Sequence, residues 1–168
     1  QFGGLEGREA LGLQVEMHML LNEYAEANEK LAEAMYVLLR VPNDPAYYPV
    51  IHNMAVTYQR CDFPLPAIEL YDRALRLAPD DAERAFTYAN MASAFHMAMN
   101  YAGDADAVAR HLHDGIYAAT AALDGPSERE VVTEATALAH RSVLLNAIGH
   151  HDAALEDARR CRELAEKH

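Results

Sequence analysis

The amino-acid sequence predicts an all-α protein, and three observations support this fold class. Alanine and leucine are abundant among the 168 residues, whereas valine and isoleucine are sparse, a composition that favours helices over strands. Apolar residues recur at intervals of three and four, as expected for the buried faces of amphipathic helices. Prolines divide the stretch VTYQRCDFPLPAIELYDRALRLAPDD, residues 56–81, into short helical segments.

The prolines of this stretch indicate a helical hairpin. We expect one helix to end near Cys61 and a second to run from about Pro66 to Leu77, because proline is tolerated in the first turn of a helix. Pro79 marks the end of the second helix, and Asp80 is a typical N-cap for the next one. The residues expected in the apolar faces are Ile51, Met54, Ala55, Tyr58, Ala67, Tyr71 and Ala74.

The same pattern of helix, turn and helix accounts for the rest of the chain. Asp104 is an expected N-cap, and Gly149 is expected to form the last turn. The helix after Asp104 carries Val108, Leu112, Ile116 and Ala119 at helical spacing, and the next helix carries Leu138, Ser142 and Leu145. We therefore predict one domain, residues 1–168, of four hairpins at about residues 5–41, 46–79, 82–123 and 127–166.

Two of these segments, residues 48–81 and 135–164, resemble the tetratricopeptide repeat (TPR) family. Small residues such as Ala55 and Ala67 stand at the positions where the family's helices approach closely, and Pro79 ends the unit as the family's proline does. The stretch GHHDAALEDA is similar to the turn and second helix of the repeat. The resemblance implies eight helices stacked as a right-handed α-α superhelix, with a longer third hairpin and a weaker match in the first.

In this family the first helices of successive hairpins line a concave groove that binds peptides. The resemblance places the following residues in that groove: His52, Asn53, Val56, Gln59, Arg60, Phe86, Asn90, Ser93, His96, Met97, His140 and Val143. Asn53 and Asn90 occupy the same position in consecutive hairpins, where an amide can donate to and accept from a peptide backbone. Capping of neighbouring hydrogen bonds is the alternative role for both.

Charge and composition exclude several classes of function. The net charge of −12 argues against nucleic acid and favours a basic or neutral partner. No apolar stretch approaches the roughly 20 residues of a membrane span, so we expect no membrane partner. The two distant thiols, Cys61 and Cys161, indicate a reducing cytoplasm, and the bias toward arginine and alanine is typical of a GC-rich bacterial genome.

The sequence carries no catalytic motif, so we expect neither an enzyme nor a cofactor. It lacks a phosphate-binding glycine loop and the patterns His-Glu-x-x-His and Gly-x-Ser-x-Gly. Nine histidines raise the question of a metal, but His111 and His113 point in different directions on a helix. His111 and Asp114 are spaced to meet, yet two ligands do not make a site, and no metal is expected.

The expected function is binding of a peptide or partner protein in the groove, as a scaffold. A second interpretation remains open because the last helix has an apolar stripe of Leu155, Ala158, Cys161 and Leu164. In that interpretation the chain is the N-terminal regulatory or oligomerisation domain of a larger bacterial signalling protein, such as a diguanylate cyclase or a transcriptional regulator, and forms a homodimer through its terminal helices.

Overall fold

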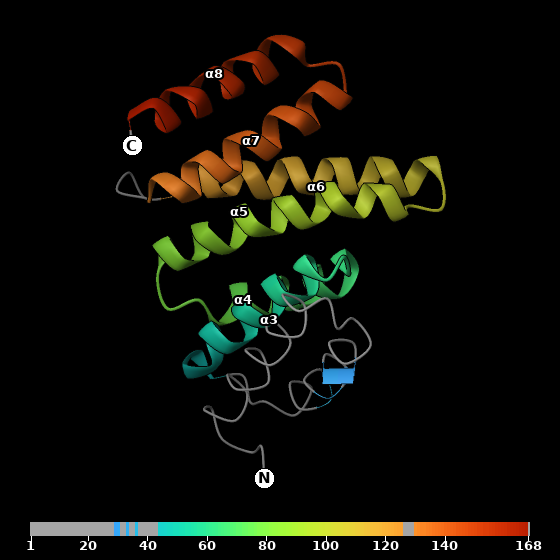
Figure 1. Cartoon of the computed structure of the whole chain (residues 1–168), viewed down its shortest axis with the longest axis vertical. Helices are drawn as coiled ribbons and strands as arrows, with labels where there is room; N and C mark the ends of the chain where they lie inside the picture. Colours follow the sequence, from blue (N-terminus) through green and yellow to red (C-terminus); the bar gives the residue numbers. More distant parts are fainter. Residues whose placement is uncertain (1–28, 31–32, 34–35, 37–43, 126–129, 168) are drawn as a thin grey trace. The chain divides into compact units, whose positions relative to one another are not determined.

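The computed structural model describes residues 29–30, 33, 36, 44–125 and 130–167, and all regular structure in them is helical (Figure 1). The all-α prediction is confirmed for this part of the chain. The hairpin expected at about residues 5–41 lies almost entirely outside it. The chain divides into two compact units, Gln1–Leu77 and Ala78–His168, which we call the N-terminal and C-terminal units. Among the described residues, no helix has the length and apolar character needed to cross a membrane.

The N-terminal unit contains the 3-10 helix η1 (Pro45–Tyr47), α3 (Tyr48–Arg60) and α4 (Pro64–Leu77). Helix α4 begins two residues before the predicted start at Pro66. Both prolines lie in its first turn, where the backbone N–H groups have no partner within the helix, so neither proline costs a hydrogen bond. The turn before α4 is closed by the N–H of Phe63, which donates to the C=O of Tyr58 at 2.9 Å.

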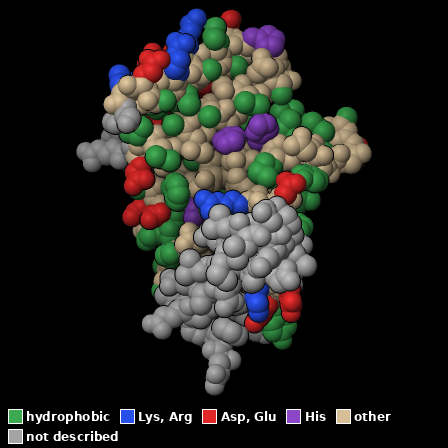
Figure 2. Space-filling model, in the orientation of Figure 1, with side chains coloured by type: hydrophobic (Ala, Val, Ile, Leu, Met, Phe, Trp, Pro, Cys, Tyr) green, Lys and Arg blue, Asp and Glu red, His purple; other side chains and the backbone are tan. Residues whose placement is uncertain are grey.

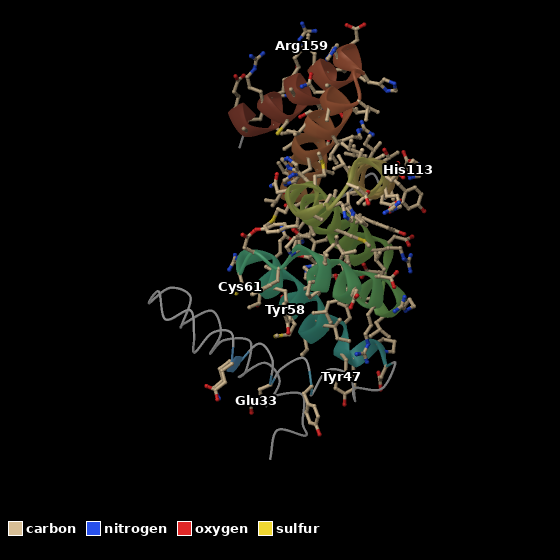
Figure 3. All side chains as sticks on the ribbon, turned by 90° about the vertical axis from the view of Figure 1, so that its right-hand side faces the viewer. Glu33, Tyr47, Tyr58, Cys61, His113 and Arg159 are labelled. Atoms are coloured by element: carbon tan, nitrogen blue, oxygen red, sulfur yellow. The ribbon has the colours of Figure 1, made fainter. Side chains whose placement is uncertain are left out.

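Helices α3 and α4 pack against each other through the apolar faces that the sequence predicts. The largest fully buried side chains at this contact are Tyr71, Ile51 and Met54. Figure 3 shows Tyr58 and Cys61 near the end of α3, where the ring of Tyr58 meets the ring of Phe63 edge-on. Alanines 55, 67 and 74 are fully buried, so the two helix backbones can approach closely.

The C-terminal unit contains α5 (Asp81–Ala98), η2 (Met99–Tyr101), α6 (Ala105–Leu123), α7 (Val131–Ala147) and α8 (His151–Lys167). Helix α7 lies at the centre of the unit, because it packs against α5, α6 and α8 (Figure 1). The helix pairs α5–α6 and α7–α8 occupy the residues of the third and fourth predicted hairpins. A continuous TPR-like superhelix through both units stays a prediction.

Local sequence signals set the ends of these helices as predicted. Asp80 Oδ1 accepts the N–H of Glu83 at 2.8 Å, and Asp104 Oδ1 accepts the N–H of Ala107 at 2.7 Å. Each carboxylate thereby satisfies a backbone donor that the helix itself leaves without a partner. Gly149 follows α7 with a φ of 83°, a left-handed conformation that glycine adopts without steric cost.

Small residues allow the helices of the C-terminal unit to approach closely. Ala89, Ala122 and Ala137 form one buried cluster between α5, α6 and α7. Gly115 of α6 lies against the side chain of Leu144, which is fully buried. The face predicted for α7 was partly wrong: Leu138 is buried, but Leu144 occupies the core where Ser142 and Leu145 were expected, and both of these are half-buried.

Helix α6 also turns a different face inward from the one predicted. Its buried residues are Gly115, Ala118, Ala119 and Ala122. Ala119 belongs to the predicted stripe, whereas Val108, Leu112 and Ile116 are only half-buried. The core beside α6 is therefore built from small residues, and the large apolar residues of this helix lie toward the surface.

Candidate functional site

The neighbouring helices α5 and α7 carry the residues of the C-terminal unit that the sequence assigns to a binding groove. Helical spacing places most of the α5 residues on one face, since they recur at intervals of three and four. Contact between α5 and α7 brings the residues of α7 beside them. We call this set the α5–α7 surface; it consists of Phe86, Asn90, Ser93, His96, Met97, His140 and Val143.

Two histidines join the two helices at this surface. The Nδ1 atoms of His96 and His140 are 3.3 Å apart, and the ring centroids are 5.5 Å apart with the planes inclined by 61°. Both side chains are half-buried. Figure 2 shows histidine side chains lying side by side on the face turned toward the viewer. The distance fits a hydrogen bond between the two rings, which requires one Nδ1 to carry a proton and the other to accept it.

This contact determines which hydrogen-bonding roles remain for the Nε2 atoms of the two rings. In a neutral pair, the ring that donates through Nδ1 has Nε2 as an acceptor, and the ring that accepts through Nδ1 has an N–H at Nε2. The pair therefore offers one donor and one acceptor. Burial, with the adjacent His96 as a second cause, lowers the pKa of His140 to about 4, so its ring is neutral at pH 7.

The other members of the α5–α7 surface are partly accessible. Val143 has 46% of its surface exposed, and the α5 residues are half-buried. Asn90 and Ser93 can donate and accept hydrogen bonds, whereas Met97 provides a flexible apolar contact. The surface thus combines hydrogen-bond donors, hydrogen-bond acceptors and apolar side chains, and its seven residues include no Lys, Arg, Asp or Glu.

In the N-terminal unit, the expectation that His52 lines an open groove is wrong. Its side chain is 3% exposed and lies between two tyrosine rings, at centroid distances of 5.6 Å from Tyr48 and 5.5 Å from Tyr71. Burial lowers the pKa of His52 to about 4. The residue belongs to the hydrophobic core of α3 and α4, because its ring is packed against Tyr71 of α4.

The remaining groove candidates of this unit lie on α3 with different exposures. Asn53 and Arg60 are exposed, whereas Val56 and Gln59 are half-buried. Gln59 also has a structural role, because its Oε1 accepts the hydroxyl of Tyr71 at 2.8 Å. Asn53 and Asn90 belong to different units, and a single groove that includes both stays a prediction.

The described residues contain no group of three or more His, Cys, Asp or Glu side chains that could hold a metal ion. His111 and Asp114 have the spacing to meet, but in the structure it is Nδ1 of His113 that lies 3.2 Å from Asp114 Oδ1 at the surface, and the His111 ring lies beside Phe95. Burial raises the pKa of the Cys61 thiol, which favours the unreactive protonated form. The thiol of Cys161 is half-buried and donates to the C=O of Ala135 at 3.5 Å.

Several contacts that hold the site in place could not be read from the sequence. Arg141 lies next to His140 on α7 and binds Asp157 of α8 and Thr120 of α6. Gly115 sets the distance between α6 and α7. No local pattern identifies either residue, because the partners of each lie more than 15 residues away in the sequence.

Comparisons with known proteins leave the family of the chain open. No protein-family model matches the sequence, and no curated protein matches it. Among solved structures, the crystal structure of BtubC (BKLC) from P. vanneervenii is similar over 95% of this chain and 80% of that chain, at 13% sequence identity and a TM-score of 0.37. A similarity at this level supports no argument about function.

Proposed function

We propose that the chain is a non-enzymatic interaction module that binds a peptide segment of a partner protein on the α5–α7 surface. The observation that carries this proposal is the contact between His96 and His140, which joins the two helices through one ring nitrogen of each residue. In a neutral pair the two Nε2 atoms then comprise one hydrogen-bond donor and one acceptor. Each peptide unit of an extended chain also presents one N–H and one C=O. The ring pair can therefore pair with a peptide backbone whatever its side chains are.

The chemistry around the ring pair supports a neutral or basic peptide. Asn90 adds an amide that donates and accepts, and Met97 adds an adaptable apolar contact. The α5–α7 surface itself includes no Lys, Arg, Asp or Glu, whereas the protein has a net charge of −12, which repels acidic ligands at long range. The resemblance of the hairpins to TPR repeats supports the same class of function and the choice of this surface.

Selection of peptides from a random library on the full chain, followed by titration calorimetry, tests the proposal. We expect Asn90→Ala, and separately His96→Ala with His140→Ala, to weaken binding of the selected peptide by about tenfold, the loss expected for one or two hydrogen bonds. Asn100→Ala, at an exposed asparagine just beyond α5, is the matched control and should leave the affinity unchanged. Equal affinities for all variants, with helicity retained by circular dichroism, would contradict the proposal.

Asn53→Ala extends the test to the N-terminal unit. A loss of affinity similar to that of Asn90→Ala would indicate that one peptide contacts both units, as in the groove of the TPR family. An unchanged affinity would restrict the binding site to the C-terminal unit and leave the α5–α7 surface as the site.

A second candidate function is self-association through α7 and α8, as in an oligomerisation domain of a larger signalling protein. The exposed apolar residues at these helices include Val132 at 66% and Leu155 at 51%. A hollow of about 480 Å³ beside Leu155 is lined mainly by small and apolar side chains. Light scattering across a wide concentration range tests this function: we expect a dimer that Leu155→Lys converts to a monomer, and a wild-type protein that is monomeric throughout would exclude it.

A further inference from the structure

The contact between His96 and His140 limits where a proton can be added to the two rings. Their Nδ1 atoms are 3.3 Å apart, and one of them carries the hydrogen that points to the other. A neutral pair has two nitrogens without a hydrogen, the accepting Nδ1 and the Nε2 of the donating ring. A proton on the accepting Nδ1 would set two N–H groups against each other. The contact therefore persists only when the first proton goes to Nε2 of the donating ring.

The environment of the two rings favours His96 as the one that becomes charged. Burial, with the adjacent His96 as a second cause, lowers the pKa of His140 to about 4, so a positive charge on His140 is disfavoured. A cationic His96 donates through Nδ1 to the neutral His140, and a charged donor strengthens such a hydrogen bond. The contact between α5 and α7 is thus retained when the pair takes up one proton.

The ionisable groups on the elements packed against α5 and α7 have other contacts or lie at the surface. The guanidinium of Arg141 binds Asp157 of α8 and is also influenced by the charge of Asp124. On α6, the His111 ring lies beside Phe95, with a centroid distance of 6.1 Å. Of the other ionisable side chains on η2, α6 and α7, Glu134 pairs with Arg160, and the following are exposed: Tyr101, Asp106, Arg110, His113, Asp114 and Tyr117.

Uptake of one proton changes which hydrogen bonds the pair can make with a peptide. In the neutral pair the two Nε2 atoms comprise one donor and one acceptor, which suits the C=O and N–H of a peptide unit. In the cationic pair both Nε2 atoms carry a hydrogen, so the acceptor for a peptide N–H is lost. A peptide N–H would then meet a ring N–H, and both donors would be left without a partner at this contact.

We propose that the His96–His140 pair is a pH-sensitive switch, in which uptake of one proton from the solvent weakens binding of the peptide on the α5–α7 surface. The inference rests on the proposed function and adds a control by pH to its site. Histidine ordinarily titrates near pH 6.5, so the weakening occurs as the pH falls through the range around this value. By linkage, a bound peptide in turn disfavours the protonated pair.

Calorimetric titration of the full chain at pH 7.5 and pH 5.5 tests the switch. The probe is a library-selected peptide with blocked ends and no side chain that titrates in this range, so that any change with pH comes from the protein. We expect its affinity to be about tenfold weaker at pH 5.5, the loss expected for one hydrogen bond. Far-UV circular dichroism at both pH values shows whether the chain stays folded.

Two histidine variants and the ring nitrogens of the free chain assign the effect to the pair. His96→Gln cannot take up a proton, so its affinities at the two pH values should agree within about twofold, whatever their level. His113→Gln removes an exposed histidine outside the α5–α7 surface and should keep the difference of the wild type. Nitrogen-15 NMR of the chain without peptide should show Nε2 of His96 gaining a hydrogen as the pH falls, while Nδ1 of His140 stays unprotonated.

The outcomes separate the switch from the proposed function. Absence of binding at both pH values would overturn the proposed function and the switch together. Binding that is equally tight at both pH values, or a fall in affinity that persists in His96→Gln, would overturn the switch alone. A free chain in which both rings stay neutral down to pH 5.5, or in which His140 takes up the first proton, would also overturn it.

Discussion

Arg141 and Asp157 form a two-point ion pair that joins α7 to α8. The guanidinium Nε and Nη2 atoms of Arg141 each donate to a carboxylate oxygen of Asp157 at 2.7 Å, and Nη1 lies 3.4 Å from Thr120 Oγ1 of α6. The Asp157 side chain is 8% exposed and that of Arg141 is 23% exposed. The hydrogen bonds to Asp157 raise the pKa of Arg141 further above its usual value. One arginine next to His140 thus connects three helices of the C-terminal unit.

Removing one partner of this pair should strongly destabilise the C-terminal unit. Arg141→Ala leaves the buried carboxylate of Asp157 without its partner, and we expect the free energy of unfolding in urea to fall by about 3–5 kcal/mol. Arg160→Ala is the control, because the pair of Arg160 and Glu134 is half exposed on the arginine side and is worth about 0–1 kcal/mol. Replacing both partners, as Arg141→Met with Asp157→Leu, should recover most of the loss. Equal effects of Arg141→Ala and Arg160→Ala would contradict this account.

Two neutral histidines should make the stability depend on pH. The pKa values of His52 and His140 are about 4 in the folded chain and 6.5 in the unfolded chain, because burial disfavours the charged rings. Between these values the unfolded chain binds more protons, so the free energy of unfolding is at its full value above pH 6.5 and falls as the pH decreases toward 4. Each histidine contributes up to about 3 kcal/mol to this loss.

Urea unfolding at a series of pH values checks this prediction. His52→Gln and His140→Gln should each reduce the slope of the free energy of unfolding between pH 6.5 and 4. Asn100→Ala is the control, since Asn100 is exposed and its side chain carries no titratable group, so the slope should be unchanged. Slopes that are the same in all three variants and the wild type would show that the two rings are not buried as described.

The turn after α7 requires glycine at one position. Gly149 has a φ of 83°, and the N–H of His150 donates to the C=O of Leu145 at 2.9 Å, which closes the end of the helix. Gly149→Ala should lower the free energy of unfolding by about 1–2 kcal/mol, the cost of a left-handed conformation with a Cβ. Gly103→Ala is the matched control: its Cβ would meet no atom within 4 Å, so no loss is expected there. Equal losses at both positions would contradict the assignment.

Gly115 is required for a different reason, the close approach of α6 to its neighbours. A Cβ there would lie 2.8 Å from Leu144 Cδ1 and 3.1 Å from Phe95 Cβ. Gly115→Ala should cost about 1–2 kcal/mol in urea unfolding, because overpacking outweighs the gain in helix propensity. Leu144→Val removes the Cδ atoms, so the double variant should be less destabilised than the sum of the two single changes. Additive losses would show that the Gly115–Leu144 contact is not the cause.

The parts of the fold that follow from local chemistry could be predicted from the sequence. Asp80 and Asp104 cap helices within three residues of themselves, and Gly149 and the prolines act on their own turns. Such signals need no knowledge of distant residues. The helical period of residues 108–119 likewise showed that a helix exists there, but a period does not show which face other helices cover.

Contacts between distant residues could not be predicted. The burial of His52 depends on Tyr71 of the next helix, and the role of Arg141 depends on Asp157 of α8. His96 and His140 were each expected at a binding surface, but their contact depends on the packing of α5 on α7. The sequence thus predicted the positions of the candidate site. The contact between the rings of His96 and His140, which determines their hydrogen-bonding roles, is seen only in the structure.

The central claim is that a peptide binds the α5–α7 surface, and an NMR titration of the full chain with a library-selected peptide tests it most directly. We predict that the largest shifts occur in backbone amides near Asn90, Ser93 and His96 of α5 and near His140 of α7, together with the side-chain amide of Asn90. Largest shifts along Ala109–Thr120 of α6, or along the exposed side of α8, with these residues unaffected, would contradict the claim.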